Sequence, residues 1–346
     1  MQKQSWLSKL MFFLNIVLAV VTFVAYSLPF LAPKVFPFLS VLTLGLPVFL
    51  FLNFFFFVYW LLQLKRYVLL SGFVLLLGIT FVNRFYKFSE TNIPAENTDF
   101  KLMSYNVRLF NLYEWLPNTD VPEQISKFIV EEQPDILCLQ EFSPNELVSK
   151  SFNFKYNFTK LYGGKNKYGQ AIYSNYKIID EGEIEFPNSS NNVIFVDIVK
   201  GKDTMRVYSM HLQSIKISTD IHEKIDEEKS KFIFKRLSEA FTVQQQQAEL
   251  IKKHFEDCKF SKIICGDLNN SAFSYVYRTI KGDMKDAFEQ AGTGFGKSYN
   301  YKYYPARIDY VFVEENIEVK EFKSIETFQQ SDHFPQITRL KIGEKE

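Results

Sequence analysis

The sequence predicts an N-terminal region of membrane-spanning helices followed by one large α/β or α+β domain. Residues 1–90 contain three long stretches without a charged residue, whereas most charges lie in residues 91–346. From residue 100 onward, short apolar strands alternate with helices over roughly 250 residues, which suits a single domain. The chain therefore changes near residue 90 from a membrane region to a folded polar domain.

Charge separates the two parts, although the whole chain is nearly neutral. Its 346 residues include 40 Lys and Arg and 39 Asp and Glu, for a net charge of +1. Residues 1–90 hold seven of the basic residues and one acid, which leaves residues 91–346 at about −5. A hydrophobic content of 47% excludes a disordered chain. Three Cys are too few for a disulfide framework, so we expect no disulfide-linked partner.

The first part contains three stretches that are long enough, or nearly so, to cross a bilayer. About 20 apolar residues span the ~30 Å hydrocarbon layer. The second stretch is long for one crossing and short for two, so we expect a tilted helix or one kinked at Pro47. A cleaved signal peptide is disfavoured because two more apolar stretches follow the first. The predicted helices are residues 10–29, 37–62 and 67–85, within a multi-pass membrane region of residues 1–88.

Basic residues near the helix ends indicate the orientation. Three crossings divide them into Lys3, Lys9, Lys65 and Arg66 on the side of the N-terminus, and Lys34, Arg84 and Lys87 on the other side. The positive-inside rule then places the N-terminus on the inner side of the cell membrane and the C-terminal domain on its outer side.

After a polar linker at residues 89–99, residues 100–346 show the pattern of the folded domain. Apolar strands are expected at residues 101–107, 135–140, 193–199, 205–212, 262–268 and 307–313. Helices are expected at residues 120–132 and 223–255. In the longer helix we expect Gln244–Gln247 to form a solvated face, and His222 and His254 to be solvated.

Polar side chains stand at the ends of these strands. They are Asn106, Glu141, His211, Asp267 with Asn269, Asp309, and Asp332 with His333. Each alone could be an ordinary cap or turn residue, but Asp309 interrupts an apolar strand and needs a partner there. Glu141 and Asn106 offer oxygen ligands suited to Mg²⁺, and a carboxylate such as Asp309 fixes the orientation of a histidine such as His333. Together these groups suit metal-dependent phosphoester hydrolysis.

The ordered motifs SYNVR, LQE, HLQS, GDLN, RIDYVF and SDHFP resemble those of the endonuclease/exonuclease/phosphatase superfamily over about residues 100–342. This resemblance implies a four-layer α/β/β/α sandwich, in which two mixed β-sheets pack face to face between outer helices. It also implies a divalent metal, Mg²⁺ with Mn²⁺ as a substitute.

The resemblance further implies a role for each motif residue. Asn106 and Glu141 would hold the metal, with support from Asp332. His211 would contact the scissile phosphate, and Arg108 a substrate phosphate. Asp267 would align or deprotonate the attacking water, and Asn269 would position it. Asp309 would orient His333, which stabilises the transition state. Independently of the resemblance, Arg307 stands beside a site strand and could reach an anionic substrate.

The sequence leaves the substrate open between nucleic acid and a phospholipid headgroup. An acidic domain is a poor match for tight duplex DNA binding, while a bilayer anchor favours substrates in or near the membrane. The alternatives are a non-catalytic membrane-tethered binding module on the same fold and a phosphomonoesterase of the inositol-phosphate type. DNA repair fits poorly with an outward-facing, anchored domain.

Overall fold

The computed structural model describes residues 5–91, 93–187, 189–215, 227–302 and 304–343. These residues form two compact units. The helical unit comprises Met1–Phe85, Ile221–Gln245 and Ser271–Arg278. The sheet unit comprises Tyr86–Asp220, Gln246–Asn270 and Thr279–Glu346. Two segments far along the chain therefore belong to the same unit as the N-terminal helices.

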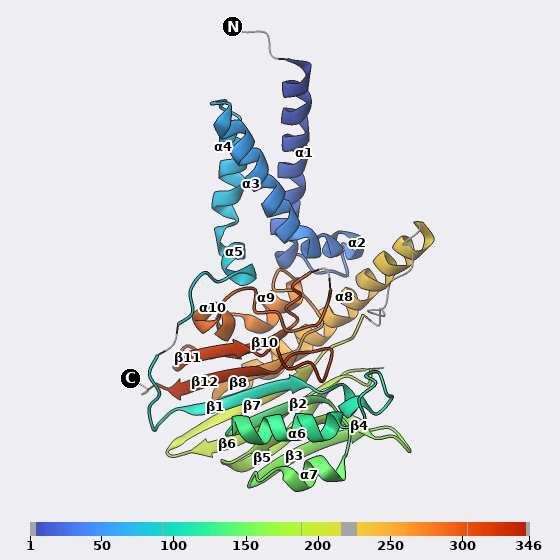
Figure 1. Ribbon diagram of the computed structural model, residues 1–346, viewed down its shortest axis with the longest axis vertical. Coiled ribbons are helices and arrows are strands. Elements are labelled where there is room, and N and C mark those ends of the chain that lie inside the picture. Colours follow the sequence, from blue (N-terminus) through green and yellow to red (C-terminus); the bar gives the residue numbers. More distant parts are fainter. Residues whose placement is uncertain (1–4, 92, 188, 216–226, 303, 344–346) are drawn as a thin grey trace. The chain divides into compact units, whose positions relative to one another are not determined.

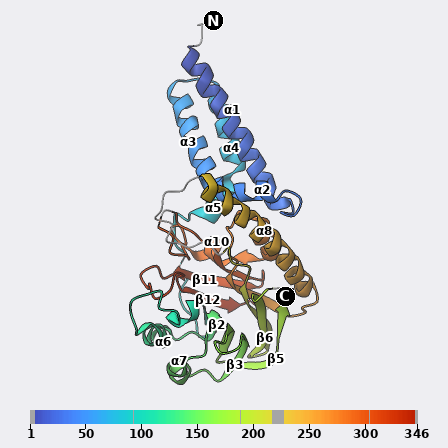
Figure 2. The same cartoon turned by 90° about the vertical axis from the view of Figure 1, so that its right-hand side faces the viewer.

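The helical unit begins with a series of helical segments, of which the longest pack side by side (Figures 1 and 2). They are α1 (Trp6–Ser27), η1 (Leu28–Phe30), α2 (Pro37–Ser40), η2 (Val41–Gly45), α3 (Leu46–Leu62), α4 (Val68–Leu77) and α5 (Ile79–Phe85). By length and composition, Trp6–Phe30 and Pro37–Leu62 could each cross a membrane, and α4 with α5 could form a third span bent by 59°. Pro47 lies in the first turn of α3, where it does not interrupt the helix.

Buried polar side chains join α1, α3 and α4. The side chain of Asn15 donates to Ser71 Oγ at 2.8 Å and accepts from the indole N–H of Trp60 at 3.0 Å. Asn53 donates to Thr22 Oγ1 at 2.9 Å. In apolar surroundings such side-chain hydrogen bonds hold neighbouring helices in one register.

Replacing Asn15 with Leu is expected to destabilise the helical unit by about 1–2 kcal/mol, because the partners on α3 and α4 lose their hydrogen bonds. Thermal unfolding of the full chain in detergent measures the effect. Val17→Leu is the matched control on α1, since Val17 is exposed on the helix surface. Equal unfolding midpoints for the two variants would contradict the bundling role of Asn15.

The helix α8 (Glu227–Glu256) contributes its residues 227–245 to the helical unit. The expectation of a solvated Gln244–Gln247 face was wrong, because Gln244, Gln245 and Gln247 are buried. The side chain of Gln245 accepts a hydrogen bond from the backbone N–H of Lys34 at 2.8 Å. His222 lies outside the described residues.

Residues 271–278 also pack inside the helical unit. Phe273 is buried in an apolar cluster with Leu46, Leu50 and Phe81. A fragment that begins at residue 91 would lack the helices that bury Phe273. Experiments on this protein therefore call for the full chain.

The sheet unit contains two six-stranded mixed sheets. The first has the order β11-β12-β1-β2-β4-β3, with β1 (Phe100–Asn106), β2 (Ile136–Phe142), β3 (Tyr156–Tyr162), β4 (Tyr168–Ser174), β11 (Ile317–Ser324) and β12 (Gln336–Ile342). The second has the order β5-β6-β7-β8-β10-β9, with β5 (Lys177–Glu185), β6 (Asn192–Lys200), β7 (Asp203–His211), β8 (Ser261–Asp267), β9 (Lys285–Asp286) and β10 (Asp309–Val313). Apolar side chains from both sheets share one core, as in a face-to-face sandwich.

Helices cover the outer faces of the sandwich, which confirms the predicted four-layer fold (Figure 2). Ile125 and Ile129 of α6 (Val121–Glu132) pack on the first sheet beside α7 (Glu146–Ser151). The C-terminal half of α8 covers the second sheet, where Phe255 packs on Tyr208. His254, which we expected to be solvated, is half-buried, and its Nδ1 lies 3.2 Å from the Tyr208 hydroxyl. The short helices α9 (Tyr275–Lys281) and α10 (Ala287–Ala291) and the turn η3 (Arg108–Asn111) complete the elements.

Candidate active site

Strand pairing brings the polar strand ends to one edge of the sandwich. The strands β1 and β2 are parallel, so Asn106 and Glu141 emerge at the same end of the first sheet. In the second sheet, His211 of β7 and Asp309 of β10 both pair with Asp267 of β8. The sequence predicted these strand ends correctly, and the register explains why residues far apart in sequence become neighbours.

Asn106 and Glu141 form the first half of the site. The buried amide nitrogen of Asn106 lies 3.3 Å from Glu141 Oε1 and 3.2 Å from Asp267 Oδ2. Glu141 has a left-handed backbone, with φ of 46°, and it lies where the pairing of β2 with β4 is irregular, between Leu139 and Phe142. Such a bulge re-aims a side chain at the edge of a sheet, and here it accompanies the turn of Glu141 toward Asn106.

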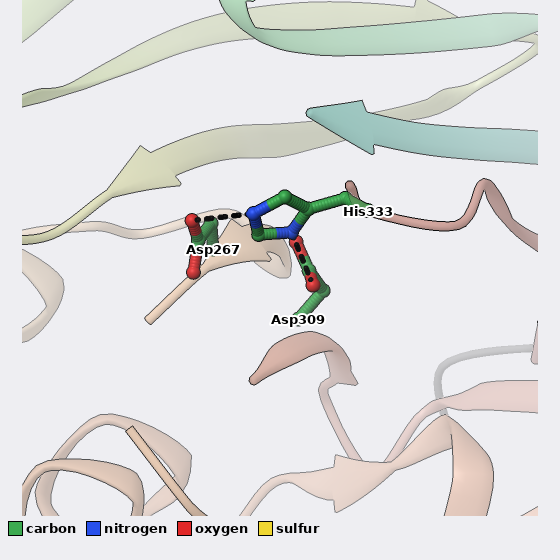
Figure 3. A group of neighbouring side chains, drawn as sticks. All are labelled: Asp267, Asp309 and His333. Atoms are coloured by element: carbon green, nitrogen blue, oxygen red, sulfur yellow. Dashed lines mark hydrogen bonds and ion pairs between the residues drawn. The ribbon is translucent and has the colours of Figure 1, made fainter. Parts of the chain in front are cut away.

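His333 and Asp309 form the second half (Figure 3). His333 Nδ1 lies 2.9 Å from Asp309 Oδ2, and its Nε2 lies 3.7 Å from Asp267 Oδ2. The backbone of Asp309 is held on both sides, because its N–H donates to Ser298 Oγ at 3.0 Å and its carbonyl accepts from Gln336 at 2.9 Å. The imidazole orientation is therefore fixed by the protein.

One oxygen, Asp267 Oδ2, is the point where the two halves meet. The amide groups of Asn106 and Asn269 approach it at 3.2 and 3.1 Å, and His333 Nε2 at 3.7 Å. Asn269, with φ of 51°, also donates its backbone N–H to the other carboxylate oxygen at 2.7 Å. A carboxylate held this firmly is well placed to position a water molecule.

The two site histidines differ in their electrostatic surroundings. Burial alone would lower the pKa of His333, but the charges of Asp309 and Asp267 outweigh it and raise that pKa to about 10. Burial lowers the pKa of His211, despite the nearby charge of Glu141. At neutral pH the site therefore holds a cationic His333 and a neutral His211. Burial also raises the pKa of Asp267, and the charge of Asp309 adds to this effect.

His211 Nε2 is a buried nitrogen with no hydrogen-bond partner among the described residues. It lies 3.5 Å from Glu141 Oε1 and 3.9 Å from Asp267 Oδ2, so it faces the centre of the site. Buried polar atoms usually have partners, so this nitrogen is free to donate to a group that enters the site between Glu141 and Asp267.

The residues present fit a divalent metal. The carboxylate of Glu141 is partly exposed, and carboxylate oxygens are ligands that Mg²⁺ prefers. The amide of Asn106 adjoins it through its nitrogen, so it would serve as an oxygen ligand only with its amide turned over. A second group of potential ligands lies within 4.8 Å of one another and consists of Asp267, Asp309 and His333. The unpartnered nitrogen of His211 lies between the two groups.

Arg108 and Asp332 lie together beside this site. Arg108 Nε and Asp332 Oδ2 are 3.3 Å apart, and the guanidinium stacks 4.4 Å above the ring of Trp115. Both side chains are partly exposed. The structure thus gives Asp332 a cationic partner, and Trp115, which the sequence did not single out, supports that partner.

Arg307 lies in the core instead of at the rim of the site. Its side chain is buried, it bonds Asp286 at 2.8 Å, and it packs against the rings of Phe288 and Tyr310. The expectation that Arg307 reaches a substrate does not agree with this position, because its guanidinium is enclosed by these partners.

The sequence also missed residues that support the site. Ser331 donates to the backbone carbonyl of Asn106 at 2.8 Å, and the ring of Tyr299 lies edge-on to His333 at 4.9 Å. Ser331 stands inside the SDHFP motif and Tyr299 inside an aromatic stretch. Their places in these segments were the only sign in the sequence that they could belong to the site. Their contacts with Asn106 and His333 arise only from the fold.

The structure thus brings carboxylate, amide and imidazole groups together at the strand ends of a two-sheet sandwich. The chain belongs to the endonuclease/exonuclease/phosphatase family, whose family model matches residues 103–333. A second model, described as a domain of unknown function, matches residues 8–85. A search of curated proteins found no match.

Solved structures share the fold at low sequence identity. An endonuclease/exonuclease/phosphatase from Bacteroides vulgatus is 20% identical with a TM-score of 0.54, covering 71% of this chain and 100% of that one. D. rerio TDP2, complexed with a single-strand DNA product, is 16% identical with a TM-score of 0.51, covering 71% and 100%. The human Nocturnin catalytic domain with bound sulfate is 14% identical with a TM-score of 0.52, covering 74% and 97%. At these identities the likeness extends to the fold alone.

Proposed function

We propose that the chain is a membrane-anchored, divalent-metal-dependent phosphodiesterase. The observation that carries the proposal is the convergence on Asp267 Oδ2. Asn106, Asn269 and His333 surround this oxygen, and the unpartnered Nε2 of His211 faces it. A proton acceptor, a water-positioning amide and two imidazoles of different charge are the groups that hydrolysis of a phosphoester needs.

Each side chain has a role that follows from its position. Asp267 accepts the proton of a water that Asn269 orients, and the water oxygen attacks phosphorus as the ester oxygen departs. The cationic His333, held by Asp309, and the neutral His211 donate to the non-bridging phosphate oxygens. Arg108 contacts a neighbouring phosphate. Mg²⁺, or Mn²⁺ in its place, would be held by Glu141 and Asn106 with Asp332 nearby, and would supply Lewis-acid stabilisation of the phosphate charge.

The helical unit favours three membrane crossings. The loop between the first two spans contacts α8, since the Lys34 backbone donates to Gln245. At the start of the second span, the ring of Phe38 stacks on Phe234 at 5.9 Å. If residues 37–62 cross a membrane, positions 34 and 234 would share one side of it, and an even number of crossings would separate them. The span Pro37–Leu62 supplies one crossing, so the bent pair α4–α5 supplies the second.

The outer face is the proposed location of the sheet unit, on the balance of basic residues at the helix ends. An alkaline phosphatase fusion after Glu90 is expected to be active, and a fusion after Gln63, between the second and third crossings, inactive. Reporter activity in intact cells measures both. A cytoplasmic signal for the Glu90 fusion would overturn the orientation, and equal signals for both fusions would overturn the third crossing.

The substrate class we favour is a phosphodiester near the bilayer, either a lipid headgroup or nucleic acid. The net charge of about −5 for residues 91–346 disfavours tight binding of duplex DNA. The full chain in nanodiscs should be assayed against DNA, RNA, a sphingomyelin-like lipid and inositol phosphates. Hydrolysis of monoesters alone would favour a phosphomonoesterase, and metal binding without any hydrolysis would favour a binding module; either result would contradict the proposal.

A further inference from the structure

The connection between α1 and α3 exposes an unusual number of large apolar side chains. We call them the apolar patch: Phe30, Leu31, Val35, Phe36, Phe38 and Leu39, each between 41% and 61% exposed. So many exposed large apolar side chains within ten residues of chain are unusual on soluble proteins and indicate contact with a membrane or a partner. Because the patch continues directly into two candidate spans, a bilayer is the surface it can meet.

The length of the second span places the patch at a definite depth. As a continuous helix, the 26 residues of Pro37–Leu62 would measure about 39 Å, against ~30 Å for the hydrocarbon layer. The 17 residues of α3 alone would take about 25 Å of that layer. That leaves about 5 Å of the layer for the residues before α3, so most of α2 and η2 would lie in the headgroup zone.

The apolar patch and its loop contact residues 227–245 of α8. The rings of Phe38 and Phe234 stack with an interplanar angle of 1°, and Gln245 accepts from the Lys34 backbone. On another face of α8, Phe232 is 57% exposed, with the guanidinium of Arg236 5.4 Å from its ring.

Basic side chains flank these two phenylalanines. Residues 229–236 read KSKFIFKR, with four basic residues and no acid. Lys231 and Lys235 are highly exposed and pair along the helix with Glu227 and Glu239, which lie to either side of this stretch. Residues 227–245 as a whole hold four basic residues and three acids, a net charge of +1, and the positive charge is concentrated in residues 229–236. Aromatic rings flanked by long basic side chains suit the interface of a bilayer, where the rings enter the acyl boundary and the ammonium groups meet lipid phosphates.

We propose that residues 227–245 of α8 form a second membrane-contact element, an interfacial amphipathic helix that inserts Phe232 and binds anionic lipid headgroups. This inference rests on the proposed membrane anchoring and not on the proposed hydrolytic activity. It means that a helix far along the chain from the anchor lies at the bilayer surface. A lipid surface is favoured over a second copy of the chain because the patch continues into the spans and the stretch is basic.

The test uses single cysteines carrying an environment-sensitive fluorophore in the full chain, reconstituted in nanodiscs whose lipids have brominated acyl chains. Cys258→Ser removes the partly exposed native thiol, while Cys138 and Cys265 stay buried. Phe232→Cys is the probe site. Val17→Cys, exposed on α1, is the positive control, and Glu146→Cys, on the surface of α7, is the negative control.

Bromine quenching is expected at positions 232 and 17 and not at 146. Quenching at 17 without quenching at 232 would overturn the interfacial helix and leave the anchoring intact. No quenching at 17 would overturn the anchoring itself. A label at 232 that is shielded from water but unquenched would identify a second copy as the occupant, which also overturns the proposal.

The role of the basic side chains is tested by comparing neutral and anionic nanodiscs. Quenching at 232 is expected to increase when phosphatidylglycerol replaces part of the phosphatidylcholine in the nanodisc. Converting Lys229, Lys231, Lys235 and Arg236 to Gln should abolish that increase. If quenching at position 232 is the same with and without phosphatidylglycerol, the proposed binding of anionic headgroups is wrong.

Discussion

Asp267→Asn is expected to lower kcat for a phosphodiester by about 100- to 10,000-fold, the range that a positioned general base contributes. The substitution keeps the shape of the side chain but removes the proton acceptor at the oxygen where the site converges. The amide oxygen can still accept from the backbone N–H of Asn269, which now lies 2.7 Å from the carboxylate. The loss should therefore fall on kcat rather than on KM.

The measurement is steady-state kinetics on the full chain in detergent, with thermal unfolding as a check on folding. Asp283→Asn is the matched control, since Asp283 is an exposed aspartate in the same unit. If Asp267→Asn kept more than a tenth of the wild-type kcat, Asp267 would not be the base.

Glu141→Gln is expected to weaken Mg²⁺ binding by more than about tenfold and to lower activity in parallel at fixed metal concentration. The neutral amide has the size of the carboxylate but lacks its charge, and Glu141 is the carboxylate adjoining Asn106 and facing His211. Raising the Mn²⁺ or Mg²⁺ concentration should restore part of the activity, which separates a metal-binding defect from misfolding.

Isothermal titration calorimetry of the full chain with each metal measures this effect directly. Glu146→Gln is the matched control, because Glu146 is an exposed residue whose only described ionic partner is Lys150 on the same helix. Unchanged metal affinity in Glu141→Gln would contradict the assignment. The metal site would then have to be assigned to the neighbouring group of Asp267, Asp309 and His333.

The strands of the site could be predicted because their sequences are continuously apolar and end in a polar residue. The predicted strands at 205–212 and 262–268 differ from β7 and β8 by a residue or two at their ends. Parallel pairing then brings such ends together without further information. The left-handed backbone of Glu141 and Asn269 could not be predicted from the local sequence, since neither residue is a glycine.

Burial of polar side chains could not be predicted, because it depends on partners far away in the sequence. Gln245 is covered through its bond to Lys34, and Gln247 accepts from the backbone N–H of Gln213 at 2.9 Å. Arg307 is withdrawn into the core by Asp286. Amphipathic periodicity shows that a helix has two faces, but it does not show what covers each of them.

The most direct test of the central claim combines metal removal with the loss of one imidazole. Hydrolysis of a chromogenic phosphodiester by the full chain should require Mg²⁺ or Mn²⁺, should stop with EDTA, and should fall at least about 100-fold in His333→Ala with metal present. Activity that survives both EDTA and His333→Ala would contradict a metal-dependent phosphodiesterase at this site.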